Sequence, residues 1–535
     1  MTQKKVAIVG AGLAGLVTLK SCLEEKVDVT AFEQETHIGG NWKFKEKGIS
    51  IFRNTELTSS KYLTAFSDFP MPEEYPHFLK HTQYLDYLQA YAQHFDLNRH
   101  IKFGTSVKSI QRQGDQWSLE VAPSEAGNRL VFDAIAVCTG LNTAWELPAL
   151  TNKSDFKGKI IHSSAYKDSR PYHDQNVVVI GGGESGGDLV YELSQVASEV
   201  TLSLRRGVFV MPKLDKQMTL PGDYFHLRST YHLPPIIYER LEGLVQNLFT
   251  FVNRKQASWQ IRHILIRLSG GRYHQQIITK SDTLTQSLTR ANVHLKPGIQ
   301  RFTTDGVVFD DGTTTQADTI IFCSGFKISF PFLPIDSQGW DWRHLYKKIF
   351  HPDLPNIGFV GFARPHIGAM PPITELQARY FAGIVSDRLR LPDPDQMRTI
   401  IDADAQRTTQ TKPLVVERVT GIVSFVPYLY ELAELIGCQP VLSQLVKQPA
   451  VLWSVLFGTV AGPHFRLCGP HSDPLAGRVI AKEGLHLTNL KTMKEIVLFL
   501  LFQIIWGGGA MLGYPLFKML SYIPGWETLE PELKL

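Results

Sequence analysis

Two glycine-rich turns constrain this 535-residue chain more than any other feature. The first turn, at 10–15, follows the apolar run Val6–Val9, and the second, at 181–186, follows Val177–Ile180. Both read Gly-x-Gly-x-x-Gly, which allows a tight turn, close approach of the backbone to a pyrophosphate, and close packing of helix on strand. We therefore predict two dinucleotide-binding units of the Rossmann type, 171 positions apart.

A second repeat suggests how these units are assembled. Asp133–Gly140 and Asp318–Gly325 share one pattern, an acid, an apolar run and a closing glycine, which is typical of a buried strand returning to a parallel sheet. We predict an α/β fold with two Rossmann-like domains, a helical insertion and a hydrophobic C-terminal tail. The first domain would comprise 1–164 and 326–480, and the second 165–325. The insertion would cover about 207–300, without sheet strands, and the tail 481–535.

The residues after the second strand of each unit differ, and they indicate the nucleotides. Glu33 follows Val27–Phe32, where a carboxylate accepts hydrogen bonds from ribose hydroxyls. Arg205 and Arg206 follow Val200–Leu204, where guanidinium groups can bind a 2′-phosphate. We predict FAD in the first unit and NADPH in the second, with hydride passing from nicotinamide to flavin.

Composition narrows the class of enzyme. The five cysteines contain no C-x-x-C pair, which excludes a dithiol reductase, a zinc ribbon and a disulfide framework. Dioxygen is therefore the favoured electron acceptor, and no metal site is predicted. A net charge of +4 is too small to predict a nucleic-acid partner. The cysteine pattern and the lack of a readable secretory signal favour a reducing, cytosol-facing compartment.

Several stretches resemble the flavin-containing monooxygenases of the dimethylaniline N-oxide-forming type. Phe156–Lys167 resembles the F-x-G-x-x-x-H-x-x-x-[YFW] fingerprint of class B flavoprotein monooxygenases and lies between the two turns, as in that family. The resemblance covers almost the whole chain. The other similar stretches are Ile38–Trp42, Ser59–Lys61, Phe69–Pro72, Ser324–Phe326, Glu375–Tyr380 and Phe465–Pro470.

The resemblance implies that retained NADP⁺ shields a flavin hydroperoxide, which oxygenates a soft nucleophile such as an amine or a sulfide. It implies that Asn41 and Trp42 contact FAD, and that Ser185, Gly186 and Asp188 lie at the NADP pyrophosphate. His162 would organise the linker between the domains and would not transfer protons to substrate. The expected cofactor-binding residues are Gly10, Gly12, Leu13, Ala14, Gly15, Glu33, Gly40, Asn41, Trp42, Leu57, Thr58, Gly181, Gly183, Ser185, Gly186, Gly187, Asp188, Arg205 and Arg206.

One position departs from the family pattern. An asparagine usually precedes Ser-Ser-Lys, beside the flavin and the nicotinamide ribose, but this chain has Thr58 there. We expect Thr58 and Ser59 to be the catalytic residues. Thr58 either substitutes for the asparagine, lets hydrogen peroxide leak, or shifts the substrate preference toward ketones. Alternatively the swap is neutral, because a neighbouring donor such as Ser59 or Asn54 compensates.

Four functions stay open at this stage. The main hypothesis is an NADPH-dependent FAD monooxygenase acting on a small nucleophilic substrate and dioxygen. The alternatives are Baeyer–Villiger oxidation of ketones, which needs a cationic partner near the flavin, and an NADPH oxidase that releases peroxide. A non-catalytic binding protein that kept the fold is the fourth.

Two segments suggest a membrane. The stretch 224–274 holds seven lysines and arginines against two acids, interleaved with apolar residues, which fits either an anionic membrane surface or a basic helical subdomain. Ile496–Phe517 carries no charge and would span about 33 Å as a helix. We expect membrane association with cytosol-facing catalytic domains, with a cytoplasmic protein as the alternative. A homodimer is a further expectation.

Overall fold

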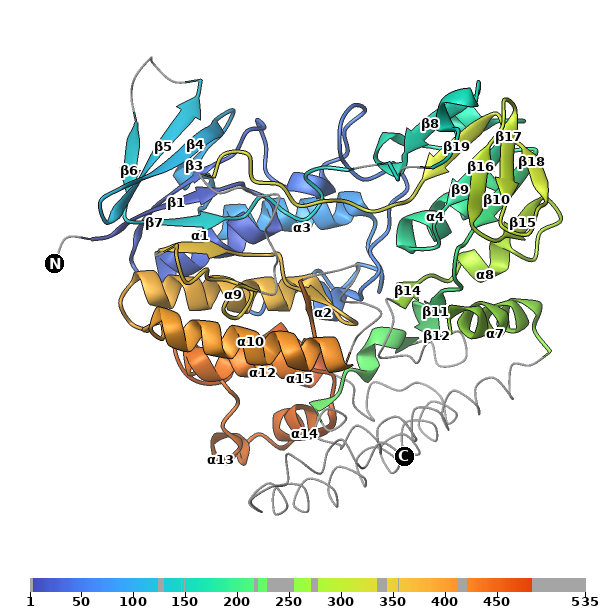
Figure 1. Ribbon diagram of the computed structural model, residues 1–535. Helices are drawn as coiled ribbons and strands as arrows, with labels where there is room; N and C mark the ends of the chain where they lie inside the picture. Colours follow the sequence, from blue (N-terminus) through green and yellow to red (C-terminus); the bar gives the residue numbers. More distant parts are fainter. Residues whose placement is uncertain are drawn as a thin grey trace.

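The computed structural model describes residues 3–123, 129–145, 147–148, 150–215, 220–228, 255–270, 278–333, 344–354, 356–411 and 421–483. Two parallel sheets of five strands lie side by side, each accompanied by a three-stranded antiparallel meander (Figure 1). Helices cover the first sheet from below in this view, and the second sheet stands at the right. This arrangement confirms the predicted α/β class with two Rossmann-like sheets.

The first sheet has the strand order β20-β7-β1-β2-β3, and all its neighbours are parallel. Its central strands are buried because their side chains are apolar on both faces. β20 lies beyond the second domain in sequence, so the first sheet is built from two separate parts of the chain. The strands are β1 (Lys5–Val9), β2 (Asp28–Phe32), β3 (Ile101–Lys102), β7 (Ala134–Val137) and β20 (Ile357–Phe359), with the meander β4 (Ser106–Gln113), β5 (Gln116–Ala122) and β6 (Leu130–Phe132).

The second sheet repeats this plan with the order β15-β10-β9-β19-β8. Asp133 accepts a hydrogen bond from the Lys5 backbone N–H at 2.7 Å, and Asp318 does the same for Asn176 at 2.7 Å. The acid that opens each repeated strand thus ties it to the strand that carries the glycine turn. The strands are β8 (Lys159–His162), β9 (Asn176–Ile180), β10 (Glu199–Ser203), β15 (Val293–Lys296) and β19 (Thr319–Phe322), with the meander β16 (Ile299–Phe302), β17 (Gly306–Phe309) and β18 (Thr314–Gln316).

Two boundary predictions need correction. β8 pairs with β19 in the second sheet, so the second domain begins before the expected boundary at residue 164. The interval 207–300 also contains strands, although it was expected to hold none. β15 pairs with β10 at the sheet edge, where alternating apolar and polar side chains suit a half-buried strand. The other strands there are β11 (Phe209–Met211), β12 (Leu214–Asp215), β13 (Leu220–Pro221) and β14 (Ile278–Lys280).

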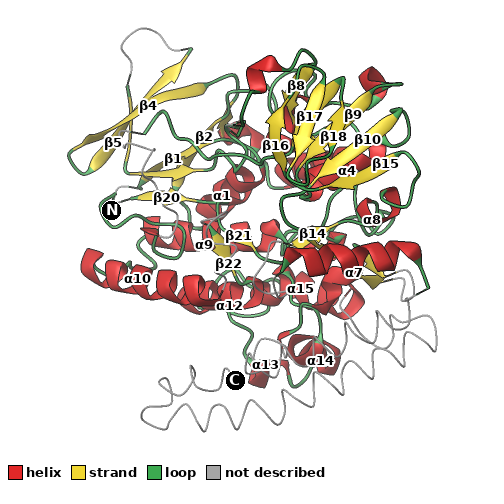
Figure 2. Ribbon diagram, turned by 45° about the vertical axis from the view of Figure 1, so that its right-hand side comes forward, coloured by secondary structure: helices red, strands yellow, loops and turns green. Residues whose placement is uncertain are grey.

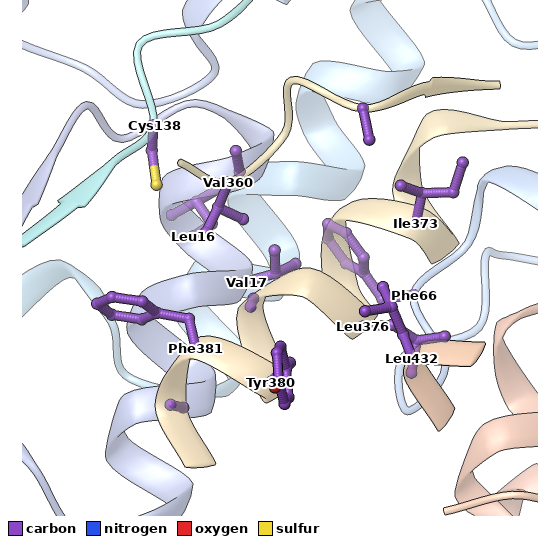
Figure 3. Close-up of a cluster of buried hydrophobic side chains, with 14 of the residues drawn as sticks. Leu16, Val17, Phe66, Cys138, Val360, Ile373, Leu376, Tyr380, Phe381 and Leu432 are labelled. Atoms are coloured by element: carbon purple, nitrogen blue, oxygen red, sulfur yellow. The ribbon is translucent and has the colours of Figure 1, made fainter. Parts of the chain in front are cut away.

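The main core lies between α1, which follows the first glycine turn, and α9. Leu16 and Val17 of α1 meet Leu376 and Tyr380 of α9, and Leu432 of α12 closes the cluster (Figure 3). Figure 2 shows α9, α10 and α12 on one side of the first sheet. The helices are α1 (Leu13–Glu24), α2 (Lys61–Thr64), α3 (His81–His94), α4 (Glu184–Leu193), α7 (Ala257–Ser269), α8 (Leu284–Ser287), α9 (Met370–Val385), α10 (Pro394–Thr411), α12 (Phe425–Ile436), α13 (Leu442–Leu445), α14 (Pro449–Phe457) and α15 (Pro474–Glu483).

The chain crosses between the two sheets along two adjacent segments. Ala144 and Lys327 exchange both backbone hydrogen bonds, with N–O distances of 3.1 and 2.8 Å, as in an antiparallel pair. Thr143 reinforces the pair, because its hydroxyl donates to the Lys327 carbonyl and accepts from the Ser329 N–H. These hydrogen bonds therefore join the segment that enters the second domain to the segment that leaves it.

The C-terminal tail at 484–535, including Ile496–Phe517, and most of the basic stretch lie outside the described residues. In the part of the chain that is described, no helix combines the length and the apolar character needed to cross a membrane.

Candidate functional site

The first glycine turn joins β1 to α1 through contacts that only glycine permits. Gly10 has a φ of 103°, and a Cβ there would lie 2.8 Å from the Cys138 carbonyl oxygen. A Cβ on Gly15 would lie 1.9 Å from the Gly10 carbonyl oxygen, so the helix can pack this closely only without a side chain. Gly12 is the N-cap residue of α1. The turn presents the helix N-terminus to any ligand above it, as phosphate binding requires.

The second turn joins β9 to α4 with almost the same geometry. Gly181 has a φ of 110°, and its Cβ would lie 2.7 Å from the Cys323 carbonyl oxygen. A Cβ on Gly186 would lie 1.9 Å from the Gly181 carbonyl oxygen, and Gly183 is the N-cap residue. A Cβ on Gly183 would meet no described atom within 4 Å, which leaves this side of the turn open. The two turns therefore have equivalent backbone geometry, which fits two nucleotide-binding turns.

Glu33 lies buried at the end of β2, beside the first turn. Its carboxylate accepts hydrogen bonds from the Ala11 N–H at 2.7 Å and from the Glu35 N–H at 2.9 Å. It thus holds the glycine turn itself and stands where the ribose of a bound dinucleotide would reach. These contacts fit the predicted role in FAD binding.

A second loop packs against the first turn. The Gly39 N–H donates to the Ala11 carbonyl at 3.2 Å. Gly40 approaches Gly12 so closely that a Cβ on Gly40 would lie 3.2 Å from the Cα of Gly12. The loop continues as a short 3₁₀ helix, Gly40–Trp42, in which Asn41 is exposed and Trp42 packs edge-on against Tyr84 at 4.9 Å. The structure therefore brings the predicted flavin contacts Gly40, Asn41 and Trp42 to the first turn.

The remaining predicted residues of the first turn lie at the start of α1. Leu13 is partly buried, and Ala14 is buried against Gly361, where a Cβ would come within 2.7 Å of the Ala14 Cβ. Leu57 is buried, and its N–H donates to the Leu79 carbonyl at 2.8 Å. These side chains pack the protein around the turn, so a FAD contact would come from their backbone.

Arg205 and Arg206 are both exposed directly after β10, beyond buried Leu204. Among the described residues neither arginine forms an ion pair, so both guanidinium groups are available to an anion. This placement fits the adenosine 2′-phosphate of NADPH.

The start of α4 carries the other residues predicted for the second nucleotide. Ser185 is exposed, whereas Gly187 is buried and packs against Ser281 and Leu284. Asp188 lies on the next turn of the helix, and burial raises its pKa to about 7, although the charge of Lys213 opposes the shift. Asp188 therefore carries a full negative charge only above neutral pH.

Thr58 lines a pocket where residues of both domains meet. The Ser59 hydroxyl is engaged with that of Thr64 at 2.8 Å, and the Asn54 side chain hydrogen-bonds to Glu192 of α4. Ser59 and Asn54, the two residues expected to compensate for the missing asparagine, therefore both have other hydrogen-bond partners. The residues that line the pocket are Thr58, Met211, Pro212, Lys213, Gly222, Asp223, Lys280 and Ile367.

Three charged residues of this pocket were not expected from the sequence. Asp223 lies in the 3₁₀ helix Gly222–Phe225, Lys213 follows β11 and Lys280 ends β14. None belongs to a recognisable motif, and they come from an interval predicted to be a separate helical insertion. No sequence signal marked them, since even Asp223 lies only eight positions after another acid, Asp215.

His162 ends β8 and is held through both ring nitrogens. Nδ1 accepts from the Ser164 N–H at 3.1 Å, so Nε2 carries the proton and donates to the Gly325 carbonyl at 3.0 Å. The ring stacks on Trp145 at 5.2 Å and meets Phe326 edge-on. Burial lowers its pKa, which keeps it neutral. These contacts fit the predicted role in organising the linker.

Two of the stretches that carry the family resemblance meet in a buried ionic cluster. Arg466, 2% exposed, contacts Glu24 at 3.0 Å, Asp68 at 2.9 Å and Glu375 at 3.3 Å. Lys20 of α1 also pairs with Asp68. Burial opposes ionisation of Asp68, but the charges of Arg466 and Lys20 hold its pKa below the usual value. The cluster joins α1 to α9 beneath the first turn and does not line the pocket.

Comparison with known proteins places this geometry in context. Residues 3–496 match the family model described as flavin-binding monooxygenase-like. The chain is 33% identical to a 4-hydroxybenzoate brominase (decarboxylating) of Marinomonas mediterranea, over 93% of this chain and 95% of that protein. It is 32% identical to dimethylaniline monooxygenase (N-oxide-forming) 4 of Oryctolagus cuniculus, over 91% and 90%. Cyclohexanone monooxygenase from Rhodococcus bound to NADP⁺ shares the fold, with a TM-score of 0.58, 16% identity, and coverage of 82% and 98%.

Proposed function

The chain belongs to the flavin-binding monooxygenase-like family, and on that premise we propose that it oxygenates a nucleophilic nitrogen or sulfur of a small molecule. It is an oxidoreductase that uses FAD and NADPH. When bound, FAD takes two electrons from NADPH and activates dioxygen, of which one atom reaches the substrate and the other leaves as water. The proposal includes the mechanism implied by the family resemblance, in which NADP⁺ stays bound while a soft nucleophile is oxygenated.

The observation that carries the proposal is the position of the pocket. Thr58 and Ile367 come from the first domain, whereas Met211, Lys213 and Lys280 come from the second. The cavity itself is only about 10 Å³, room for about one water molecule. It marks where the two domains meet beside Thr58, and a substrate bound there would require these side chains to move apart. A site closed to bulk water prevents side reactions.

The residues of the chain hold the cofactors and do little of the chemistry. The glycine turn at 10–15 and Glu33 would bind FAD, and the turn at 181–186 with Arg205 and Arg206 would bind NADPH. We propose Thr58 as the hydroxyl donor closest to the reaction, because it alone among the predicted catalytic residues lines the pocket.

Product analysis tests the main proposal. Purified protein loaded with FAD is given NADPH and, separately, thioanisole, N,N-dimethylaniline or phenylacetone, and oxygenated product, peroxide and NADPH consumption are measured together. We expect sulfoxide or N-oxide in a fixed ratio to NADPH. Peroxide that accounts for all NADPH with every substrate would instead establish an oxidase.

Baeyer–Villiger oxidation is the second candidate, and a specific observation favours it. That reaction needs a cation near the flavin, and the pocket beside Thr58 holds two lysines, Lys213 and Lys280. An ester as the dominant product from phenylacetone would decide for it. A further arm with bromide and 4-hydroxybenzoate covers the activity for which the Marinomonas relative is named.

We further propose that the protein associates with a membrane. Ile264 and Leu268 of α7 are 51% and 59% exposed, beside the basic residues Arg262 and Arg267. This face and the uncharged stretch at 496–517 support the proposal. Vesicles containing anionic lipid should bind the full chain and bind an Ile264→Ser, Leu268→Ser variant less. A homodimer stays a prediction, which the mass measured by light scattering would test.

A further inference from the structure

Thr58 lies on a bend of the chain that is flanked by two backbone hydrogen bonds. Before the bend the Leu57 N–H donates to the Leu79 carbonyl at 2.8 Å, and after it the Lys61 N–H donates to the His77 carbonyl at 2.7 Å. Within the described part of the chain, no backbone N–H between these two points is hydrogen-bonded to the first domain. The position of Thr58 therefore depends on what else holds the bend.

Asp223, from the second domain's part of the chain, supplies this support. It lies in the 3₁₀ helix Gly222–Phe225, and its Oδ2 accepts from the Ser60 N–H at 2.7 Å. The two residues are 4% and 0% exposed, so bulk water does not replace the hydrogen bond. A buried N–H that loses its acceptor is costly, and for this reason nearly all such groups in proteins are paired. Asp223 therefore fixes the backbone two residues after Thr58.

The 3₁₀ helix that carries Asp223 is itself held in place. The Thr459 hydroxyl donates to the Tyr224 carbonyl, and the Val460 N–H donates to the His226 carbonyl at 2.8 Å. These two contacts come from the first domain and follow Asp223 directly in the chain. The carboxyl group is therefore a fixed support for the bend and not the end of a mobile side chain.

A hydrogen bond, and not a charge, accounts for this support. Burial raises the pKa of Asp223, although the charge of Lys280 opposes the shift. The carboxyl group also lines the cavity of about 10 Å³ beside Thr58, which has room for about one water molecule. A neutral side chain of the same shape, with one acceptor oxygen, should therefore hold the Ser60 N–H equally well.

A second contact from the second domain lies on the other side of the bend. The Nζ of Lys213 pairs with Glu56, two residues before Thr58, at 2.5 Å. The Glu56 side chain is 44% exposed, and ion pairs this open to solvent contribute little. Of the two supports, the buried hydrogen bond of Asp223 should therefore dominate.

We propose that Asp223 is a positioning residue, which fixes Thr58 for oxygen transfer through the backbone of Ser60, with Lys213 in a minor role. The inference rests on the proposed function, because it states how Thr58 is placed for that reaction. It assigns to Asp223 no contact with substrate or cofactor. A displacement of about 1 Å near a reacting group can cost about 100-fold in rate, so loss of the support should be measurable.

A double-mutant cycle tests the proposal on the FAD-loaded full chain with thioanisole and NADPH. Sulfoxide and peroxide are measured for Thr58→Val, for Asp223→Ala and for the variant with both changes. We expect each single change to raise the ratio of peroxide to sulfoxide by about 10- to 100-fold, because the hydroxyl is either absent or displaced. In the Thr58→Val background, Asp223→Ala should add less than about 2-fold, since no hydroxyl is left to position.

Further variants separate positioning from charge and from stability. Asp223→Asn keeps an acceptor oxygen for the Ser60 N–H and should keep the native ratio. Asp223→Glu keeps the charge but moves the acceptor by one methylene, and it should raise the ratio as Asp223→Ala does. Lys213→Met should raise it by less than about 3-fold. Asp133→Ala is the matched control, because it removes a carboxylate that accepts from the Lys5 N–H at the same 2.7 Å, and it should leave the ratio unchanged.

Hydrogen exchange gives a readout that does not depend on turnover. It is measured on the oxidised, NADP⁺-saturated protein, for the peptide that contains Ser60. Asp223→Ala should speed exchange at this amide by about 10-fold or more, because the N–H loses its acceptor. Asp223→Asn should leave the exchange rate close to that of the native protein.

The inference and the proposed function fail in different ways. Effects of Thr58→Val and Asp223→Ala that simply multiply would overturn the inference and leave the oxygenase intact, as would an Asp223→Asn ratio as high as that of Asp223→Ala. Native protein that forms only peroxide would overturn the proposed function, and exchange at Ser60 would then decide whether Asp223 holds the bend. Flavin content shows whether each variant is folded. If Asp223→Ala is not, Asp223→Glu takes its place in the cycle and in the exchange measurement.

Discussion

The two glycine turns share one close contact. At the first turn a Cβ on Gly15 would lie 1.9 Å from the Gly10 carbonyl oxygen, and at the second a Cβ on Gly186 would lie 1.9 Å from the Gly181 carbonyl oxygen. The surroundings of the two turns differ. The first is covered by Gly39–Trp42 and held by buried Glu33, whereas the second is open at Gly183 and followed by two exposed arginines. The same backbone geometry therefore occurs once in a covered setting and once in an open one.

The helices that follow the two turns, α1 and α4, also differ in how firmly they are packed. α1 is fastened from beneath by the ionic cluster around Arg466, and Val17 on α1 is fully buried. The equivalent position of α4 is Asp188, only partly buried. The first turn is therefore backed by packed and ion-paired side chains, whereas the second is accompanied by the ionisable groups Asp188, Arg205 and Arg206. The predictions below test this difference in order of expected effect.

Removal of the Arg466 guanidinium should have the largest effect on stability, and the effect should fall mainly on the first domain. Arg466→Met leaves Glu24, Asp68 and Glu375 with too little positive charge, and a broken buried ion pair costs about 3–5 kcal/mol. We expect a lower free energy of unfolding in urea and loss of FAD on gel filtration. Arg398→Met, which breaks a partly exposed pair with Asp353, is the control and should cost less than about 1 kcal/mol. Similar losses in both variants would contradict a special role of the cluster.

Alanine at the third glycine of each turn should separate the two cofactors. Gly15→Ala and Gly186→Ala both force a Cβ into a carbonyl oxygen, a strain of about 3 kcal/mol. We expect Gly15→Ala to purify without flavin, and Gly186→Ala to stay yellow but to be reduced poorly by NADPH. In Gly183→Ala the new Cβ meets no described atom within 4 Å, so thermal stability should be unchanged while NADPH affinity falls. A Gly186→Ala protein that purifies without flavin would contradict this separation, because a change in the second domain would then have disrupted the first.

Loss of the two arginines should erase the preference for the phosphorylated cofactor. In Arg205→Gln, Arg206→Gln, the rate of flavin reduction at low NADPH should fall about 10- to 100-fold, because charge-assisted hydrogen bonds to the 2′-phosphate are lost. The rate with NADH, which lacks that phosphate, should change little. Arg112→Gln, in the meander of the first half, is the matched control. An equal fall with both cofactors would assign the arginines to another part of the nucleotide.

The smallest expected effect concerns Asp188 and depends on pH. Because burial raises the pKa of Asp188 to about 7, the folded state favours the neutral acid. Its contribution to stability is complete below the pKa of the unfolded chain and is lost as pH rises through 7. Asp188→Asn should therefore be more stable than the native protein at pH 8, by about 1 kcal/mol after allowance for partial exposure, and equal to it near pH 4. Thermal unfolding at the two pH values measures the difference, and a constant offset would contradict the assignment.

Much of the fold could be predicted because the repeated units obey local rules. The apolar runs before the turns and the acid-led runs at Asp133 and Asp318 became parallel strands, as expected. The interval 207–300 was misjudged because β11, β14 and β15 are short strands within a stretch of basic composition. β8 was placed in the wrong domain because a single strand of four residues carries no sign of its partner.

The candidate site was only half visible in the sequence. The residues predicted to touch a nucleotide fall within motifs, because the backbone geometry of the turn demands glycine at fixed spacing. Asp223 and Lys280 follow no such rule, since they meet only after the chain has folded. The same reason explains Arg466 and Glu375, which were noticed as family stretches but act together as a buried ion pair.

The paired crossing at Ala144 and Lys327 has a consequence for how such a protein can be assembled. The segment between these residues starts and finishes at one spot on the first domain, with its two ends already hydrogen-bonded to each other. The second domain is therefore inserted at a single paired crossing, and exchanging it for another of similar footprint would leave β7 and β20 paired as before. A replacement domain would also have to reproduce the contacts of Asp223 with Ser60 and of Lys280 with Gly368, so a change of electron donor would involve this interface as well.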